Sequence, residues 1–121
     1  MRVLIELTAW SEAPRAAQAE VLRELAEALR RWNEATAPHD RGADVRYSDT
    51  ARPIGTPDVW RDARAVRADA PIRGASCVEL AAMYARRGDS VVVLPPDDGG
   101  ETWHAVVVRE DHTVMDPVER G

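Results

Sequence analysis

The chain of 121 residues is long enough for one compact domain and too short for two domains that each bury their own core. Its composition, 45% hydrophobic and 31% charged, is typical of a globular protein and gives no sign of a disordered or fibrous one. A net charge of −5 argues against nucleic acid as a partner, because backbone binding needs clustered Lys and Arg, and a single cysteine excludes an intrachain disulfide.

The N-terminal part of the chain predicts a strand followed by a long helix. β-Branched residues and leucines favour a strand over residues 2–7. A helix is expected from about residue 11 to residue 35, with Pro14 tolerated in its first turn and Pro38 beyond its end. Apolar residues recur along it at three- and four-residue steps, and charged residues occupy the other side. The apolar stripe consists of Gln18, Val21, Leu22, Leu25, Leu29 and Trp32, and the charged side of Arg23, Glu24, Glu27, Arg30 and Arg31.

The middle of the chain predicts an edge strand and a second helix. Residues 44–48 alternate in a way that favours a short strand. A helix is expected over residues 56–67, because Thr56 can cap it and Pro57 suits its first position. The proline and glycine of residues 71–76 are expected to break the chain again.

The last third predicts a helix and three antiparallel strands. Ser76 can cap a helix that begins at Cys77 and continues to about Arg87, where Gly88 ends it. Strands are expected over residues 91–94, 102–109 and 113–116, joined by a loop at 95–100 and a tight turn at 110–112. The sequence therefore predicts an α+β fold in which the cysteine-bearing helix packs on a small antiparallel sheet, preceded by a strand and a long amphipathic helix.

Cys77, His104 and Asp116 have the residue types and the order of a nucleophilic site. A helix start lowers a thiol's pKa, because its free N–H groups and its dipole favour the thiolate. His104 on a strand can act as the base, and Asp116 on the neighbouring strand can hold its tautomer, since antiparallel neighbours lie about 5 Å apart. The backbone N–H of Cys77 is expected to meet an oxyanion, with Trp60 as a candidate second donor. No Cys/His cluster has metal-ligand spacing.

Each of these residues also has a plainer interpretation. A lone cysteine is often a small buried hydrophobe, a strand histidine often has a satisfied ring, and an aspartate before Pro117 often forms a turn. Their order along one helix and two neighbouring strands favours the catalytic interpretation of Cys77, His104 and Asp116.

Other polar residues are expected to be solvated. His39 lies in a predicted turn and His112 at a predicted hairpin tip. Glu79 is expected to be a surface charge on its helix, and Asp97 and Asp98 to belong to a polar loop.

Three segments together resemble the transglutaminase-like branch of the papain-like cysteine proteins: residues 74–81 (GASCVELA), 103–108 (WHAVVV) and 114–117 (VMDP). A narrower likeness, over about residues 44–120, is to small transglutaminase-like proteins encoded among the structural genes of tailed bacteriophages and prophages. The resemblance implies a single transglutaminase-like domain over residues 1–121, with no cofactor and no metal.

The resemblance also implies a role for each site residue. It makes Cys77 the nucleophile, His104 the general base and acid, and Asp116 the orienting residue. The family commonly has an acidic residue directly before the cysteine and another two positions after it. Ser76 stands at the first of these positions, and Glu79 at the second.

Two functions remain open from the sequence. The first is cysteine-dependent acyl transfer by a peptidase, amidase or transglutaminase that acts on a protein or peptide substrate. The second is a catalytically inactive virion or phage-like particle component that uses the same fold to pack against other particle proteins. No apolar run suits a signal peptide or a membrane span. We therefore expect no membrane partner and a location in the bacterial cytoplasm or in a phage particle.

Overall fold

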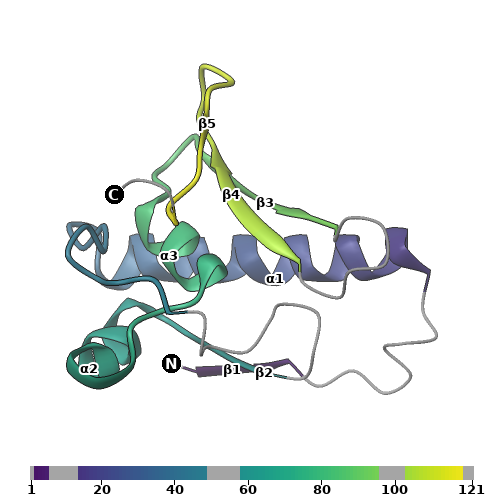
Figure 1. The fold of residues 1–121 in the computed structure, drawn as a ribbon. Coiled ribbons are helices and arrows are strands. Elements are labelled where there is room, and N and C mark those ends of the chain that lie inside the picture. The colour runs from purple at the N-terminus through teal and green to yellow at the C-terminus, as the bar shows by residue number, and fades with distance from the viewer. Residues whose placement is uncertain (1, 6–13, 49–57, 96–102, 119–121) are drawn as a thin grey trace.

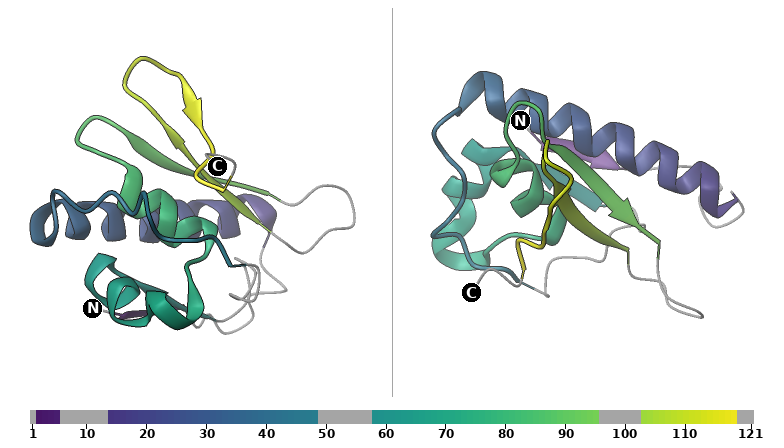
Figure 2. Two further views of the ribbon diagram at one scale, coloured as in Figure 1. Left: turned by 60° about the vertical axis from the view of Figure 1, so that its left-hand side comes forward. Right: turned by 90° about the horizontal axis from the view of Figure 1, so that it is seen from above.

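The fold is α+β, and its two small sheets lie on either side of a long helix (Figures 1 and 2). The computed structural model describes residues 2–5, 14–48, 58–95 and 103–118. The helices in these ranges are α1 (Arg15–Thr36), α2 (Ala63–Arg73) and α3 (Cys77–Tyr84). One antiparallel sheet contains β1 (Arg2–Ile5) and β2 (Asp58–Arg61), and the other contains β3 (Ser90–Leu94), β4 (His104–Val108) and β5 (Val114–Met115) in that order. None of the described helices combines the length and the apolar character needed to cross a lipid bilayer.

Helix α1 packs an apolar stripe into the main core. Leu22, Ala26 and Leu29 are buried there, and the helix ends before Ala37 and Pro38 as predicted. Two residues differ from the predicted pattern. Trp32 is 43% exposed, and Arg30 is buried because it bonds to acidic side chains one turn away in both directions. Ion pairs with Glu27 and Glu34 therefore allow Arg30, from the charged side of the helix, to be buried.

Asn33 joins the three helices. Its Nδ2 donates to the carbonyl oxygen of Ala82 in α3 at 3.1 Å, and its Oδ1 accepts from the backbone N–H of Ala63 in α2 at 2.8 Å. Nearby, Nε1 of Trp32 donates to Oδ2 of Asp62, the N-cap of α2, at 2.8 Å. The end of α1 thus fixes the start of α2 and the middle of α3.

Residues 58–61 form strand β2, so the helix predicted over 56–67 was wrong in its first half. The register of the antiparallel pair places Val3 opposite Trp60. The helix begins only after Asp62, whose side chain accepts a hydrogen bond from the first turn. A β-branched and an aromatic residue suit a strand, and pairing with a distant partner outweighs the local helix signal.

Helix α2 continues through the predicted proline break and ends at Gly74. With φ 65° and ψ −161°, Gly74 has a backbone conformation that is essentially restricted to glycine, and an added Cβ would lie 2.7 Å from the carbonyl oxygen of Arg46. In place of the edge strand predicted over residues 44–48, the described chain has a single parallel bridge between Tyr47 and Ala75. Gly74 therefore turns the chain directly from α2 into α3.

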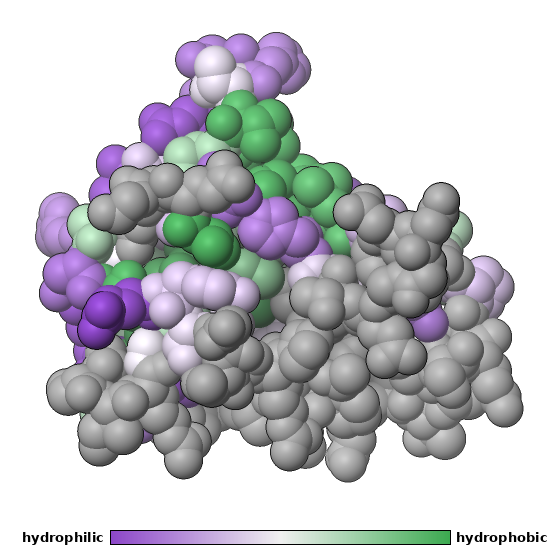
Figure 3. Space-filling view, viewed as in Figure 1, coloured by the Kyte–Doolittle hydropathy of each residue, from purple (hydrophilic) through white to green (hydrophobic). Residues whose placement is uncertain are grey.

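The three-stranded sheet has two distinct faces, and its strands confirm the predicted order. The inner face packs on α1 and α3 through residues of the main core, which are Val91, Val93, Ala105 and Val107. Because side chains alternate along a strand, the residues between them point to the other side, which we call the outer face. The outer face consists of Ser90, Val92, Leu94, His104, Val106, Val108, Val114 and Asp116. Apolar side chains gather over β4 and β5 in Figure 3.

Candidate active site

Cys77 is the first residue of α3, as predicted. Ser76 is the N-cap: its Oγ accepts from the backbone N–H of Glu79 at 3.4 Å, and Oε1 of Glu79 accepts from the backbone N–H of Ser76 at 3.0 Å. This reciprocal pair is a capping box, which fixes where the helix begins. Ser76 therefore has a structural role at the cysteine.

Glu79 is buried, so its prediction as a surface charge was wrong. It is 2% exposed, and its carboxylate accepts hydrogen bonds from the side chain of Arg61 in β2. Arg61 also donates to the carbonyl oxygen of Gly74 at 2.7 Å and to Asp69 at 3.0 Å. The hydrogen bonds that Arg61 donates to Glu79 raise the pKa of Arg61 above its ordinary value, despite the opposing effect of burial. Because α3 is buried around its whole circumference, helical periodicity does not identify an exposed side.

His104 and Asp116 form a close pair on the outer face. Nε2 of His104 lies 2.6 Å from Oδ2 of Asp116, and Oδ1 of Asp116 accepts from the backbone N–H of Val118 at 2.9 Å. The register pairs Val107 with Met115, so the histidine and the aspartate are diagonal neighbours across β4 and β5. The carboxylate therefore holds the orientation of the imidazole ring.

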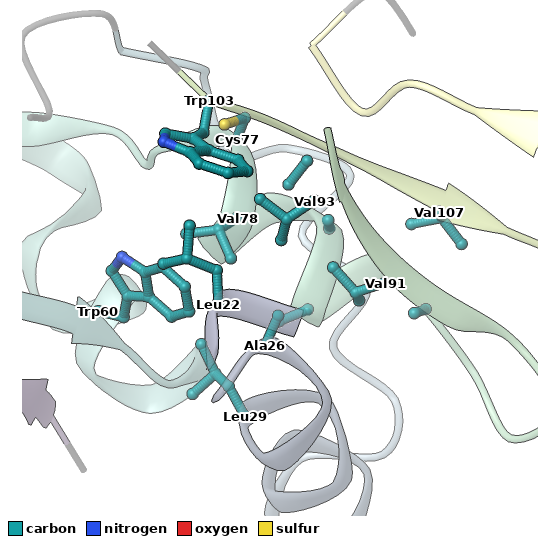
Figure 4. Packing of buried hydrophobic residues seen from close by; sticks show 14 residues of the cluster. Leu22, Ala26, Leu29, Trp60, Cys77, Val78, Val91, Val93, Trp103 and Val107 are labelled. Carbon is teal, nitrogen blue, oxygen red and sulfur yellow. The ribbon is translucent and has the colours of Figure 1, made fainter. Parts of the chain in front are cut away.

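The Cys77 thiol is shielded from solvent. The residue is 7% exposed, and Figure 4 shows the indole of Trp103 beside it. Burial raises the pKa of the Cys77 thiol, and the charge of Asp116 adds to this, whereas the backbone N–H groups of Ala105, Val78 and Cys77 itself act in the opposite direction. The predicted low-pKa thiol was therefore wrong: desolvation outweighs the helix start.

The Cys77 thiol approaches β4 at the residue that follows His104. The backbone N–H of Ala105 favours the thiolate form of Cys77, and Ala105 directly follows His104 in the sequence. In the described ranges no hydrogen bond joins the side chains of Cys77 and His104, and Nε2 of His104 is occupied by Asp116. Nδ1 is therefore the ring nitrogen that Asp116 does not engage.

Trp60 lies in the core, away from the cysteine. In Figure 4 the side chains of Leu22 and Val78 lie between the Trp60 indole and Cys77. Trp60 is thus poorly placed to donate to an oxyanion at that sulfur, and Trp103 is the tryptophan that packs there. The sequence signal for Trp103 was its position directly before His104.

The remaining polar residues occupy solvated positions or lie outside the described chain. His39 and His112 are exposed, as predicted. Asp97 and Asp98 lie outside the described residues. Within the described ranges, no group of three or more His, Cys, Asp or Glu side chains is placed to hold a metal ion.

Comparison with known proteins finds no relative of this chain. No family model matches it, and no match was found among curated proteins or among solved structures. The geometry of Cys77, His104 and Asp116 is thus the basis on which a function can be proposed.

Proposed function

We propose that this chain is a cysteine-dependent acyl-transfer protein with a papain-like, transglutaminase-like core and a protein or peptide substrate. The observation that carries the proposal is the 2.6 Å contact between Nε2 of His104 and Oδ2 of Asp116, on strands next to the helix that begins with Cys77. An oriented imidazole and a cysteine at a helix start are the groups that nucleophilic catalysis by a thiol requires.

The proposed reaction balances with these three side chains. Nε2 of His104 donates to Asp116, and Nδ1 accepts the thiol proton as the Cys77 sulfur attacks the acyl carbon. The C–N bond then breaks, and the proton moves from Nδ1 to the leaving amine. Water or a second amine attacks the thioester and gives a proton to Nδ1; the C–S bond breaks, and that proton returns to the sulfur. The attacking molecule decides between peptidase, amidase and transglutaminase activity.

The raised pKa of Cys77 sets the order of proton transfer in this scheme. Because burial keeps the thiol neutral, its proton leaves during attack and does not form a resting ion pair with His104. His104 then acts as a general base, a role worth roughly 10²–10⁴-fold in rate. The backbone N–H of Cys77 is the proposed donor to the oxyanion.

The second candidate is a catalytically inactive component of a phage or phage-like particle. The shielded thiol favours it, since Cys77 packs against Trp103 as a small core residue does. In that case the fold serves protein–protein packing, and the pair of His104 and Asp116 has a structural role.

Acylation by p-nitrophenyl acetate separates the two candidates. An acyl-transfer protein should release a burst of nitrophenol with an acetyl group on Cys77, detected by peptide mass spectrometry. His104→Ala should slow acylation by about 100-fold or more. His112→Ala is the matched control, because it removes an exposed histidine at the hairpin tip and should change nothing. Equal rates in wild type and His104→Ala would contradict the enzyme and favour the particle component.

A further inference from the structure

We propose that Leu94 selects acyl donors that carry an apolar side chain next to the reacting amide. This inference deepens the proposed acyl transfer and rests on it. Leu94 and His104 are direct partners in the register of β3 and β4, and both belong to the outer face. Side chains of such partners have Cβ atoms about 4.5–5.5 Å apart. A group delivered to the imidazole therefore comes within van der Waals reach of Leu94.

The exposure of Leu94 leaves it available to a ligand. It is 42% exposed although it lies at the end of a strand whose inner side chains are buried. A leucine with this exposure still has apolar surface to remove from water, and a bound apolar group would remove it. Leu94 is thus a contact that favours an apolar substrate over a polar one.

The charges of the outer face support the same substrate class. Among its described residues, the outer face has no Lys or Arg, and its one carboxylate, Asp116, is engaged by His104. His104 therefore lies between an acid on the β5 side and Leu94 on the β3 side. Val92 is the next residue of β3 on this face and is partly exposed, whereas its cross-strand partner Val106 is buried.

A matched pair of thiol reagents tests the proposal. N-(3-methylbutyl)iodoacetamide and N-(2-methoxyethyl)iodoacetamide present an apolar and a polar group of similar length. Each rate constant at Cys77 is divided by the rate with free N-acetylcysteine. Wild type should favour the apolar reagent by about fivefold or more. Leu94→Ser should bring the ratio close to one, whereas Leu94→Met should retain it.

Val114→Ser is the control for a general loss of apolar surface. Val114 belongs to the same face, is 64% exposed, and pairs with Val108 away from His104. The ratio of the two rate constants in Val114→Ser should therefore match that of wild type. Thermal melting checks that each variant is folded. An unchanged ratio in Leu94→Ser, an equal fall in Val114→Ser, or no reaction of Cys77 with either reagent would overturn the proposal.

A second copy of the chain is the rival occupant of this face. Analytical ultracentrifugation would detect such self-association. If wild type associates as its concentration rises and both Leu94→Ser and Val114→Ser abolish the association, the substrate assignment is overturned. Failure of the proposed acyl transfer would be seen in a different experiment: p-nitrophenyl acetate would acylate wild type and His104→Ala at the same rate.

Discussion

Glu79 receives three hydrogen bonds from Arg61: from its backbone N–H at 2.8 Å, from Nε at 2.8 Å and from Nη2 at 3.0 Å. The two side chains are almost sealed from solvent. Their contact joins the helix that begins with Cys77 to strand β2. Glu79, which was predicted from the sequence to be a surface charge, therefore anchors that helix in the fold.

Glu79→Gln should strongly destabilise the fold. The change removes the buried negative charge and leaves the Arg61 guanidinium with Asp69 as its counterion. Breaking a buried ion pair typically costs about 3–5 kcal/mol in the free energy of unfolding. Urea denaturation measures the loss. Glu20→Gln, which alters an exposed ion pair with Arg23, is the control and should have no measurable effect. A loss below about 1 kcal/mol for Glu79→Gln would argue against the anchoring role.

Asn33→Ala should loosen the junction of the three helices. It leaves the Ala82 carbonyl and the Ala63 N–H, both buried, without their partner, at a cost of roughly 2–4 kcal/mol in the free energy of unfolding. Thr36→Ala removes a more exposed bond within the same helix and should change stability by about 0.5 kcal/mol or less. Equal urea midpoints for the two variants would show that the junction does not depend on Asn33.

Asp40→Asn should weaken the dependence of stability on acid. Hydrogen bonds from Arg67 at 2.6 and 2.8 Å hold the pKa of Asp40 below its ordinary value of 3.8, against the effect of burial. The unfolded carboxyl binds its proton at higher pH, so this stability is present above about pH 4 and is lost as pH falls through the folded pKa. Urea denaturation between about pH 5 and pH 3 should give a shallower slope for the variant than for wild type. Parallel slopes would rule out this linkage.

Alkylation of Cys77 by iodoacetamide should report the raised pKa of its thiol. Only the thiolate reacts, so the rate for the folded protein should still be rising above the ordinary thiol pKa of 9.0. The same chain unfolded in urea is the control, and its rate should level off at lower pH. A plateau near about pH 7 for the folded protein would instead show a resting thiolate.

Local signals predicted much of the region around Cys77. A serine cap, four apolar residues in a row and a tight turn between the last two strands placed α3, β3, β4 and β5 in their observed order. The short turn between β4 and β5 also brings His104 close to Asp116, so this pair could be expected from spacing alone.

The features that depend on distant partners were missed. Strand β2 forms because it pairs with β1, while the residues before it carry a local helix signal. The burial of Glu79 depends on Arg61, and the raised pKa of Cys77 depends on packing that includes Trp103. The position of Trp60 follows from the same strand pairing, which directs its indole into the core.

The capped start of α3 has a consequence for how the cysteine behaves during folding. Eight residues are too few for a stable isolated helix, so α3 persists only when Arg61 and the rest of the fold hold it. An unfolded or newly made chain therefore carries an ordinary, accessible thiol, and the shielded one arises with the native state. Since the sequence has a single cysteine, a brief pulse of a fast thiol reagent would count the unfolded molecules in a population.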